Sequence, residues 1–249
     1  MPQSAHAHSY GLQSQAKKED ALIVWSELTN NEVADLDRDL PVIVPVGLVE
    51  AHGPHLSTGF DTHAAEYMAR QICEATGAIL CPTLPYGFAD TNREYPGTLG
   101  VHADTLVAVV SDLCGLFCAH GFTKVIFLSG HGGNDLAVRL GFDKAWERWP
   151  DLKPACWTYF TTADVALSHA DKGETSLALA TGATVHMERA QDYHLRKPWH
   201  EVRSRRALAP DSGGVNGTPS EATSAYGADL LARILSVLID KVNAAIADR

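Results

Sequence analysis

The sequence has few cysteines, no long hydrophobic run and no excess of positive charge. These features argue against a cysteine-based zinc or redox motif, a membrane-spanning helix and a nucleic-acid-binding surface. It contains only five cysteines, and none shows the paired spacing of a zinc ribbon or a redox motif. Their apolar contexts favour a reducing compartment, so we expect a cytoplasmic protein. No apolar run reaches the roughly 20 residues that a membrane-spanning helix needs, so we expect no membrane span.

The charge balance also limits the partners of the chain. The 20 basic and 30 acidic residues give a formal net charge of −10. An acidic surface repels phosphate backbones and anionic lipids, so we expect neither nucleic acid nor a membrane as a partner. A small-molecule substrate fits this composition better.

The length of 249 residues suits one large α/β domain, with two smaller domains as the alternative. Residues 1–20 are rich in Ser, Gln, Ala and His, which predicts a flexible N-terminal tail outside the fold. We therefore assign residues 21–249 to a single domain.

Hydrophobic patterning predicts strands that alternate with helices along this domain. The expected strands cover residues 40–46, 78–84, 124–128 and 155–160. The expected helices cover residues 61–75, 106–120, 134–149 and 173–180, with a last helix from Ser220 or Glu221 to the C-terminus. Residues 191–219, which contain several prolines and glycines, are expected to form a long loop. This alternation predicts a mostly parallel sheet that is covered by helices on both faces.

A first polar cluster follows the first predicted strand. Glu50, His52 and Asp61 lie just beyond the apolar run that ends at Val46. Open α/β sheets build their ligand sites at the carboxyl ends of their strands. Carboxylates combined with an imidazole suit Zn, Mn or Fe. Asp61 is also expected to cap the helix that follows, and its two oxygens would allow it to bridge two cations.

A second cluster, Ser129 to Asn134, follows the strand at 124–128 and contains His131 between glycines. Two such loops after two such strands predict one metal site built from both. Further along, His169 and Glu174 bring another imidazole and another carboxylate. Glu174 would begin a helix, where its charge is favoured in any case, so this stretch alone is a weak signal.

Two readings without metal-dependent catalysis compete with this one. The glycine-rich residues 130–133 before a helix could cradle a phosphate, but no Gly-Lys-Ser/Thr signature accompanies them. The chain could also be a metal-binding scaffold without turnover. The presence of His169 and Glu174 argues against that loss.

Taken together, these stretches resemble the creatininase (creatinine amidohydrolase) family over roughly residues 24 to 190. The matching segments are Pro45-Val46-Gly47, Glu50-x-His52-Gly53-Pro54-His55, Asp61, Tyr95 to Leu99, Gly130 to Asn134, His169 and Glu174-Thr175-Ser176. Their order along the chain makes the combination specific, although no single segment is.

The resemblance implies a three-layer α/β/α sandwich with a mostly parallel sheet. It also implies two divalent metal ions per chain, Zn with Zn, Mn or Fe, and a homo-oligomer, often a hexamer. By position, Glu50, His52, Asp61 and His131 correspond to metal ligands, with Asp61 as the bridge. His169 corresponds to the catalytic histidine.

The chain departs from the family pattern at three places. Creatininase has a metal-binding Glu two residues after the second-cluster His, where this chain has Gly133, and Glu174 is the candidate replacement. Asp171 stands where relatives often have Gly. The stretch from Gly87 to Glu94 lacks the His that many relatives carry.

These observations predict a metal-dependent amidohydrolase. A hydroxide that bridges the ions would attack the carbonyl carbon of a cyclic amide, a formamide or a peptide-like bond. His169 would deliver a proton to the leaving nitrogen. The alternative within enzymes is hydrolysis of a carbon–carbon bond in a cyclic keto-polyol.

Four further residues are candidates for substrate binding. Asn92 and Arg93 could bind a carboxylate, a phosphate or a sugar hydroxyl. Tyr159 and Phe160, at the end of the fourth predicted strand, would supply an aromatic wall or would simply belong to the core. Gly132 also leaves space after His131. Together with the polar candidates Asn92 and Arg93, this predicts a substrate larger and more polar than creatinine.

Overall fold

The computed structural model describes residues 22–89, 92–194 and 212–248. The predicted tail at 1–20 and much of the predicted loop at 191–219 lie outside these residues. Within the described part, five parallel strands form one sheet in the order β1-β3-β2-β4-β5. The strands are β1 (Ile23–Val24), β2 (Val42–Val46), β3 (Ile79–Leu80), β4 (Lys124–Ser129) and β5 (Lys153–Thr158).

The two central strands, β2 and β4, are buried along their whole length. Successive side chains of β2 point to opposite faces, so Ile43 enters one apolar core while Val42 and Val44 enter the other. A parallel sheet with both faces covered needs apolar residues at every position, which explains the unbroken apolar runs in the sequence.

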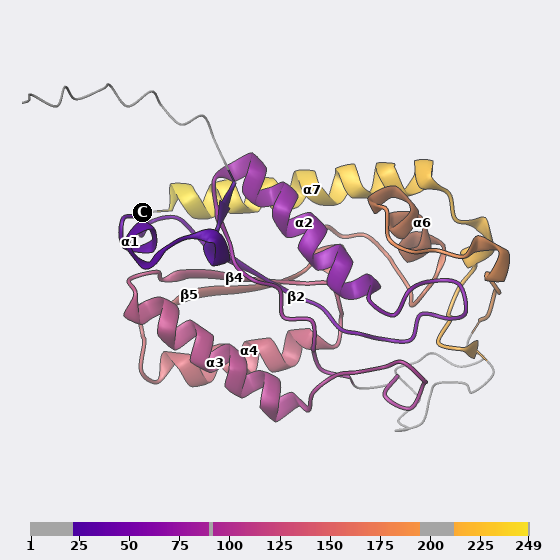
Figure 1. Cartoon of the computed structure of the whole chain (residues 1–249), viewed down its shortest axis with the longest axis horizontal. Helices are drawn as coiled ribbons and strands as arrows, with labels where there is room; N and C mark the ends of the chain where they lie inside the picture. Colours follow the sequence, from indigo (N-terminus) through magenta and orange to yellow (C-terminus); the bar gives the residue numbers. More distant parts are fainter. Residues whose placement is uncertain (1–21, 90–91, 195–211, 249) are drawn as a thin grey trace, which may run out of the picture.

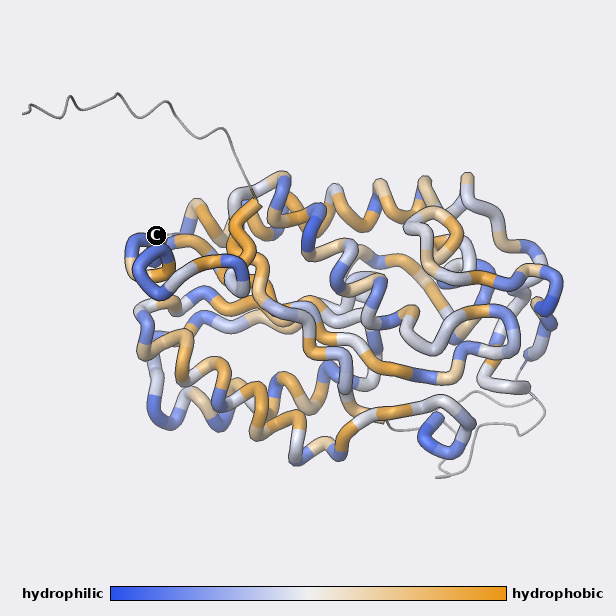
Figure 2. Tube along the Cα trace, viewed as in Figure 1, coloured by the Kyte–Doolittle hydropathy of each residue, from blue (hydrophilic) through white to orange (hydrophobic). Residues whose placement is uncertain are grey.

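Helices cover both faces of this sheet, as Figure 1 shows. The helices α2 (Phe60–Thr76), α6 (Lys172–Thr181) and α7 (Ser224–Ala247) pack on one face, and α3 (Ala103–Ala119) and α4 (Asn134–Trp146) pack on the other. Hydrophobic residues are frequent along the strands and the helices (Figure 2), and the buried ones form two apolar clusters, one on each face of the sheet. The predicted three-layer α/β/α architecture is therefore confirmed.

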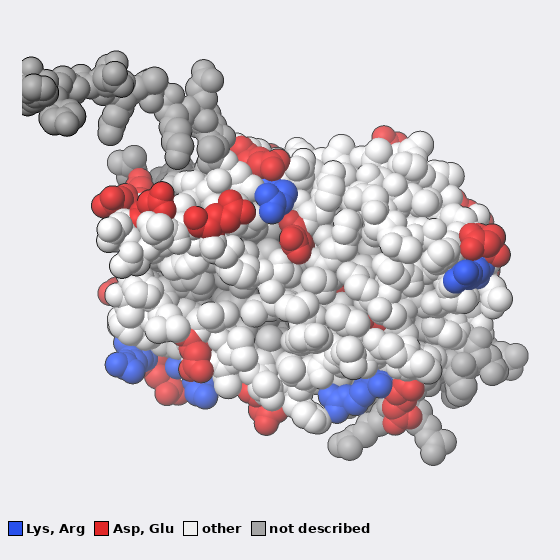
Figure 3. Space-filling view, in the orientation of Figure 1, with Lys and Arg blue, Asp and Glu red and all other residues white. Residues whose placement is uncertain are grey.

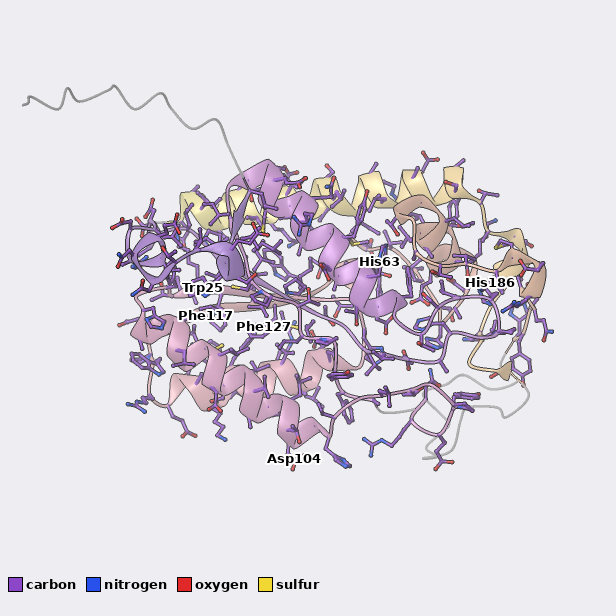
Figure 4. The ribbon with its side chains drawn as sticks, viewed as in Figure 1. Trp25, His63, Asp104, Phe117, Phe127 and His186 are labelled. Atoms are coloured by element: carbon purple, nitrogen blue, oxygen red, sulfur yellow. The ribbon has the colours of Figure 1, made fainter. Side chains whose placement is uncertain are left out.

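Aromatic side chains fill the layer between the sheet and the α3–α4 pair. Trp25, in the short 3₁₀ helix Trp25–Glu27 that precedes α1 (Asn30–Ala34), meets Phe117 edge-to-face with ring centroids 5.5 Å apart. Figure 4 shows these two rings and Phe127 on the same side of the sheet. Burying one such side chain stabilises the fold by roughly 1.5–3 kcal/mol.

The surface in Figure 3 carries few charges, and acidic side chains gather toward the end that holds α1. Among the described helices, none is both long enough and apolar enough to cross a membrane. Even α7, with 24 residues, carries charged side chains along its exposed side.

Several predicted boundaries differ from the structure. The second strand is limited to Ile79–Leu80, although Leu84 still bridges to β2 through Val46. The last strand ends at Thr158, and a short helix, α5 (Tyr159–Thr162), follows it. The C-terminal helix begins at Ser224, because Thr223 caps it and Pro219–Glu221 form a separate 3₁₀ turn.

The expectation that Asp61 caps α2 is wrong. The capping position is Gly59, which offers no side chain, and Asp61 lies inside the first turn of the helix. Its side chain is almost completely buried and turns toward the loops that follow β2 and β4. A buried carboxylate at a helix start still gains from the helix dipole, but its contacts are with imidazoles.

Candidate metal centre

The carboxyl ends of β2 and β4 lie next to each other, since Val46 pairs with Ser129. The loops that leave these two strands therefore run side by side and meet the start of α2. Gly130 allows this approach, because a Cβ atom at this position would overlap the backbone carbonyl of Asp61.

Asp61 lies at the centre of the resulting cluster. Its Oδ1 is 3.1 Å from Nε2 of His52, and its Oδ2 is 3.2 Å from Nδ1 of His131. The two oxygens of one carboxylate thus face two different imidazoles. This is the arrangement that a ligand shared by two cations requires.

Two groups of potential ligands meet at Asp61, and each keeps its ligand atoms within 4.8 Å of one another. We call the group of His52, Asp61 and Glu174 the closed half, because these side chains are nearly or fully buried. We call the group of Glu50, Asp61 and His131 the open half, because the His131 side chain keeps 12% of its surface exposed. The structure brings together all five predicted ligands.

His169 lies beside both halves. Its Nδ1 is 3.8 Å from Oε2 of Glu50, and its ring centroid is 4.4 Å from that of His52. With Glu50 and His52 it forms a third group whose ligand atoms lie within 4.8 Å of one another. The predicted catalytic histidine is therefore in contact with the predicted ligands.

Backbone carbonyls fix the orientation of two of the imidazoles. Nδ1 of His52 donates to the carbonyl of Glu50 at 3.0 Å, which turns Nε2 toward Asp61. Nε2 of His169 donates to the carbonyl of Ala51 at 2.8 Å, which leaves Nδ1 facing Glu50. Such hydrogen bonds hold the tautomer and the ring of a metal-binding or proton-transferring histidine in place.

Glu174 reaches the cluster from the start of α6. Asp171 caps this helix by accepting from the backbone N–H groups of Gly173 and Glu174. The residue between His169 and Asp171, Ala170, has a positive φ of 50°, a conformation that non-glycine residues rarely adopt. Its N–H donates to Oε2 of Glu174 at 2.6 Å, so the strained turn positions the carboxylate.

The cluster stabilises positive charge in a buried place. Burial by itself would lower the pKa of His52, but the neighbouring Asp61 and Glu174 raise it to about 10. Burial opposes the ionised form of Glu50, yet His131 and His169 hold the pKa of that carboxyl below its usual range. Without a metal ion, protons on the imidazoles balance the negative charge of these buried carboxylates. A divalent cation would take over this role, because it binds the imidazoles in their neutral form and the carboxylates in their ionised form.

Glu174 and His169 have pKa shifts in the opposite sense. Burial raises the pKa of Glu174 to about 8, although His52 opposes the shift. Burial likewise lowers the pKa of His169, although the charge of Glu50 opposes it. His169 is thus kept neutral, with a free lone pair directed into the cluster.

Buried polar atoms without hydrogen-bond partners also support a metal centre. Oε2 of Glu50, Nε2 of His52 and Oδ2 of Asp61 are buried and have no hydrogen-bond partner among the described residues. Buried polar atoms are normally hydrogen-bonded, so three orphaned acceptors in one place need an explanation. Carboxylate oxygens and an imidazole nitrogen are ligands that suit Zn or Mn.

Asn92 and Arg93, two predicted substrate-binding residues, lie in different places. Asn92 is buried, and its amide donates to Oε1 of Glu50 at 2.8 Å and lies 2.9 Å from Nε2 of His169. It therefore supports a ligand and the catalytic candidate at once. Arg93 is exposed and turns away from the cluster, where its guanidinium donates to the carbonyl of Ala89.

The two aromatic candidates also separate. Tyr159 is fully buried and belongs to the apolar core under α2, α6 and α7. Phe160 is partly exposed, and its ring would lie 3.5 Å from a Cβ atom at Gly132. Of the two, Phe160 is the side chain that borders the space next to His131.

Sequence reasoning missed the role of Asn134. This buried side chain donates to the carbonyl of Gly47 at 3.2 Å and accepts from the backbone N–H of Phe88 at 2.8 Å. It ties the loops after β2 and β3 to the start of α4. Its place directly after the glycine-bracketed His131 was the available signal, but a helix-starting Asn is too common to indicate this role.

Comparison with known proteins places this geometry in a family. The sequence model described as "Creatininase: Creatinine amidohydrolase" matches residues 26–242. The chain is 28% identical over 211 residues to the mycofactocin precursor peptide peptidase of Mycolicibacterium smegmatis, covering 81% of this chain and 83% of the relative. It is 27% identical over 128 residues to the creatinine amidohydrolase of Pseudomonas putida, covering 49% of this chain and 48% of the relative.

Solved structures agree on the fold. A crystal structure of creatinine amidohydrolase superposes with a TM-score of 0.81 at 23% identity and covers 91% of this chain and 99% of the other. A mutant creatininase described as Zn-Zn type superposes with a TM-score of 0.80 at 23% identity and covers 88% of this chain and 96% of the other.

Proposed function

The chain belongs to the creatininase family of hydrolases, and we propose that it is an amidohydrolase that works with two divalent metal ions. The ions would be Zn with Zn, Mn or Fe. His52, Asp61 and Glu174 would hold one ion, and Glu50, Asp61 and His131 would hold the other. Bound ions would supply Lewis-acid polarisation of a carbonyl and would lower the pKa of water.

The observation that carries this proposal is the position of Asp61. Its two carboxylate oxygens face His52 and His131, which belong to loops from different strands. A purely structural carboxylate would be satisfied by hydrogen bonds, yet Oδ2 has no hydrogen-bond partner among the described residues. Glu174 supplies the carboxylate that Gly133 cannot, so each half keeps three ligands.

His169 is the candidate for proton transfer. Its neutral imidazole presents Nδ1 to the cluster, while the carbonyl of Ala51 holds the opposite side of the ring. In hydrolysis of an amide, a C–O bond forms to water, the C–N bond breaks, and the nitrogen gains a proton. His169 would accept the proton from water and pass it to the leaving nitrogen.

The substrate we propose is peptide-like and larger than creatinine. A relative that matches over most of both chains is named as a precursor peptide peptidase. Gly132 adds no side chain next to His131, and a Cβ atom there would make only an ordinary 3.5 Å contact with Phe160. An extended amide with polar neighbours suits a site without a bulky residue at this position better than a small flat ring.

The experiment is a substrate panel with the enzyme loaded with Zn or Mn. The panel contains creatinine, N-formyl amino acids, short peptides and a keto-inositol. We expect peptide or acylamino acid turnover that EDTA abolishes and added metal restores. Turnover of the keto-inositol alone would establish carbon–carbon hydrolysis instead, and metal binding without turnover of any compound would establish a silent scaffold.

A further inference from the structure

A pocket of about 430 Å³ lies against the loop that carries Glu50. Its volume falls within the roughly 300–1,000 Å³ of typical ligand pockets. The residues that line it are Tyr86, Ala89, Arg93, Thr98, Leu99 and His102, with Gly100 and Val101 between them.

The pocket is attached to the metal-binding loop on both sides of Glu50. Leu99 donates its backbone N–H to the carbonyl of Val49 at 2.8 Å, and the hydroxyl of Thr98 accepts the backbone N–H of Ala51 at 3.0 Å. The wall of the pocket and the ligand Glu50 are therefore parts of one hydrogen-bonded unit. The pocket's residues lie in the segment between β3 and α3, whereas Glu50 lies in the loop between β2 and α2 (Figure 1).

Two consecutive residues, Asn92 and Arg93, also connect the cluster to the pocket. Asn92 points inward to Glu50 and His169, whereas Arg93, the next residue, points into the pocket. A substrate that reaches from the cluster into the pocket would therefore pass Asn92 and then meet the guanidinium of Arg93.

The guanidinium of Arg93 is available for an anion. Its Nε and one terminal nitrogen donate to the carbonyl of Ala89 at 3.2 and 3.0 Å, and the other terminal nitrogen lies 3.4 Å from Nδ1 of His102. No carboxylate of a described residue forms an ion pair with it. An arginine has five N–H donors, so these contacts leave donors free for a bidentate contact with a carboxylate.

Most of the other side chains that line the pocket are apolar. Tyr86 and Leu99 expose 54% and 57% of their surfaces, and Val101 and Ala89 lie beside them. Exposed large apolar residues around a cation that pairs with no carboxylate of a described residue suit a ligand that combines an apolar group with a negative charge.

We propose that this pocket binds a carboxylate of the substrate, next to the amide that the metal centre cleaves. The inference rests on the proposed amidohydrolase function and specifies its substrate class. The substrate is an acylated amino acid or a peptide whose carboxylate pairs with Arg93 and whose apolar side chain packs on Tyr86 and Leu99.

The test compares N-acetyl-L-leucine with N-acetyl-L-leucinamide on the metal-loaded enzyme. Binding is followed by NMR titration, and hydrolysis is followed by release of leucine or leucinamide. The variants are Arg93→Met, Arg93→Lys and, as a matched control, Arg70→Met. Arg70 is exposed on α2, nine residues beyond Asp61 and therefore about 14 Å further along the helix.

We expect the carboxylate compound to bind more tightly, and Arg93→Met to weaken its binding by about 10- to 100-fold while leaving the amide unchanged. Arg93→Lys should retain part of the preference, because lysine keeps the charge but not the planar fork. Arg70→Met should change neither compound.

Equal binding of the two compounds, or a preference that survives Arg93→Met, would overturn the inference. The two proposals fail separately. An Arg93-dependent preference in binding without hydrolysis of any amide supports the carboxylate pocket and contradicts the amidohydrolase. Metal-dependent hydrolysis at the same rate with and without the substrate carboxylate supports the amidohydrolase function and contradicts the carboxylate-binding pocket.

Discussion

The closed and open halves of the metal centre share Asp61 but differ in their surroundings. In the closed half, the side chain of His52 is completely buried and that of Glu174 keeps only 8% of its surface exposed. In the open half, His131 keeps 12% exposed, and the adjacent His169 keeps 22%. Ligand exchange and substrate entry require access, so we expect the closed half to hold its ion more tightly and the open half to carry the chemistry.

The largest expected effect comes from removing the ligand that both halves share. Asp61→Ala should lose both ions and lower turnover by about 10³-fold or more, because the several kcal/mol supplied by metal ions correspond to that factor at 1.36 kcal/mol per tenfold. Mass spectrometry of the metal content and a turnover assay would measure the two effects separately, and circular dichroism would show whether the variant is folded.

Asp104→Ala is the control for this variant, since Asp104 is an exposed carboxylate at the start of α3 (Figure 4). It should keep both ions. A folded Asp61→Ala protein with its full metal content would show that Asp61 does not bridge two sites.

A smaller and more selective effect should come from one ligand of each half. Glu174→Gln should weaken the ion of the closed half, and His131→Asn should weaken that of the open half. Each loss of affinity should be at least about 10- to 100-fold, the range found when even the hydrogen-bond partners of ligands are removed. Isothermal titration with Zn would count the remaining sites.

The two halves should then differ in exchange. Glu174→Gln should leave one readily exchanged ion, and His131→Asn should leave one slowly exchanged ion. Unchanged metal content with reduced turnover in Glu174→Gln would mean that Glu174 orients His169 and is not a ligand.

A neighbouring pair of glycines gives a finer test of the open half. A Cβ atom at Gly133 would lie 2.5 Å from Nε2 of His131, whereas a Cβ atom at Gly132 would make an ordinary 3.5 Å contact with Phe160. Gly133→Ala should therefore displace His131 and weaken the ion of the open half by about 10- to 100-fold. Gly132→Ala should keep metal affinity. Equal metal affinity in the two variants would contradict the prediction that a Cβ atom at Gly133 displaces His131.

The smallest effect is expected from the thiols, which belong to neither half. Burial raises the pKa of Cys73, Cys81, Cys114 and Cys156 to about 12. A thiol with a raised pKa loses its proton only at higher pH, so its thiolate at pH 7.5 is about 10³-fold rarer than that of a free cysteine with a pKa near 8.5.

Iodoacetamide at pH 7.5 should therefore leave activity nearly unchanged, and labelling of these four thiols should rise only as the pH approaches 12 or the protein unfolds. Activity assays with mass-spectrometric labelling would test this. Inactivation by iodoacetamide together with resistance to EDTA would indicate a cysteine hydrolase.

Much of this organisation could be predicted from the sequence. Unbroken apolar runs such as Val42 to Val46 require burial on both faces, and that requirement led to the parallel sheet and the three layers. The same logic placed Glu50, His52 and His131 at adjacent strand ends, where the structure has them. The proposed oligomer and the cytoplasmic location stay predictions.

Other features depend on contacts between segments that are distant in the chain. The sequence suggested a helix cap for Asp61, because Asp is common at helix starts, but only packing against both loops shows its side chain turned to two imidazoles. Asn92 looked like a substrate contact, and tertiary structure places it on Glu50 and His169.

Residue types and their spacing by themselves determined which elements form and at which edge of the sheet the chemistry gathers, because periodicity and strand direction are local properties. Tertiary structure decided which carboxylate completes the closed half. Glu174 reaches His52 only because the turn at Ala170, with its positive φ, and the Asp171 cap aim the start of α6 at the cluster. No local pattern encodes that direction, since it depends on where α6 packs against α2 and α7.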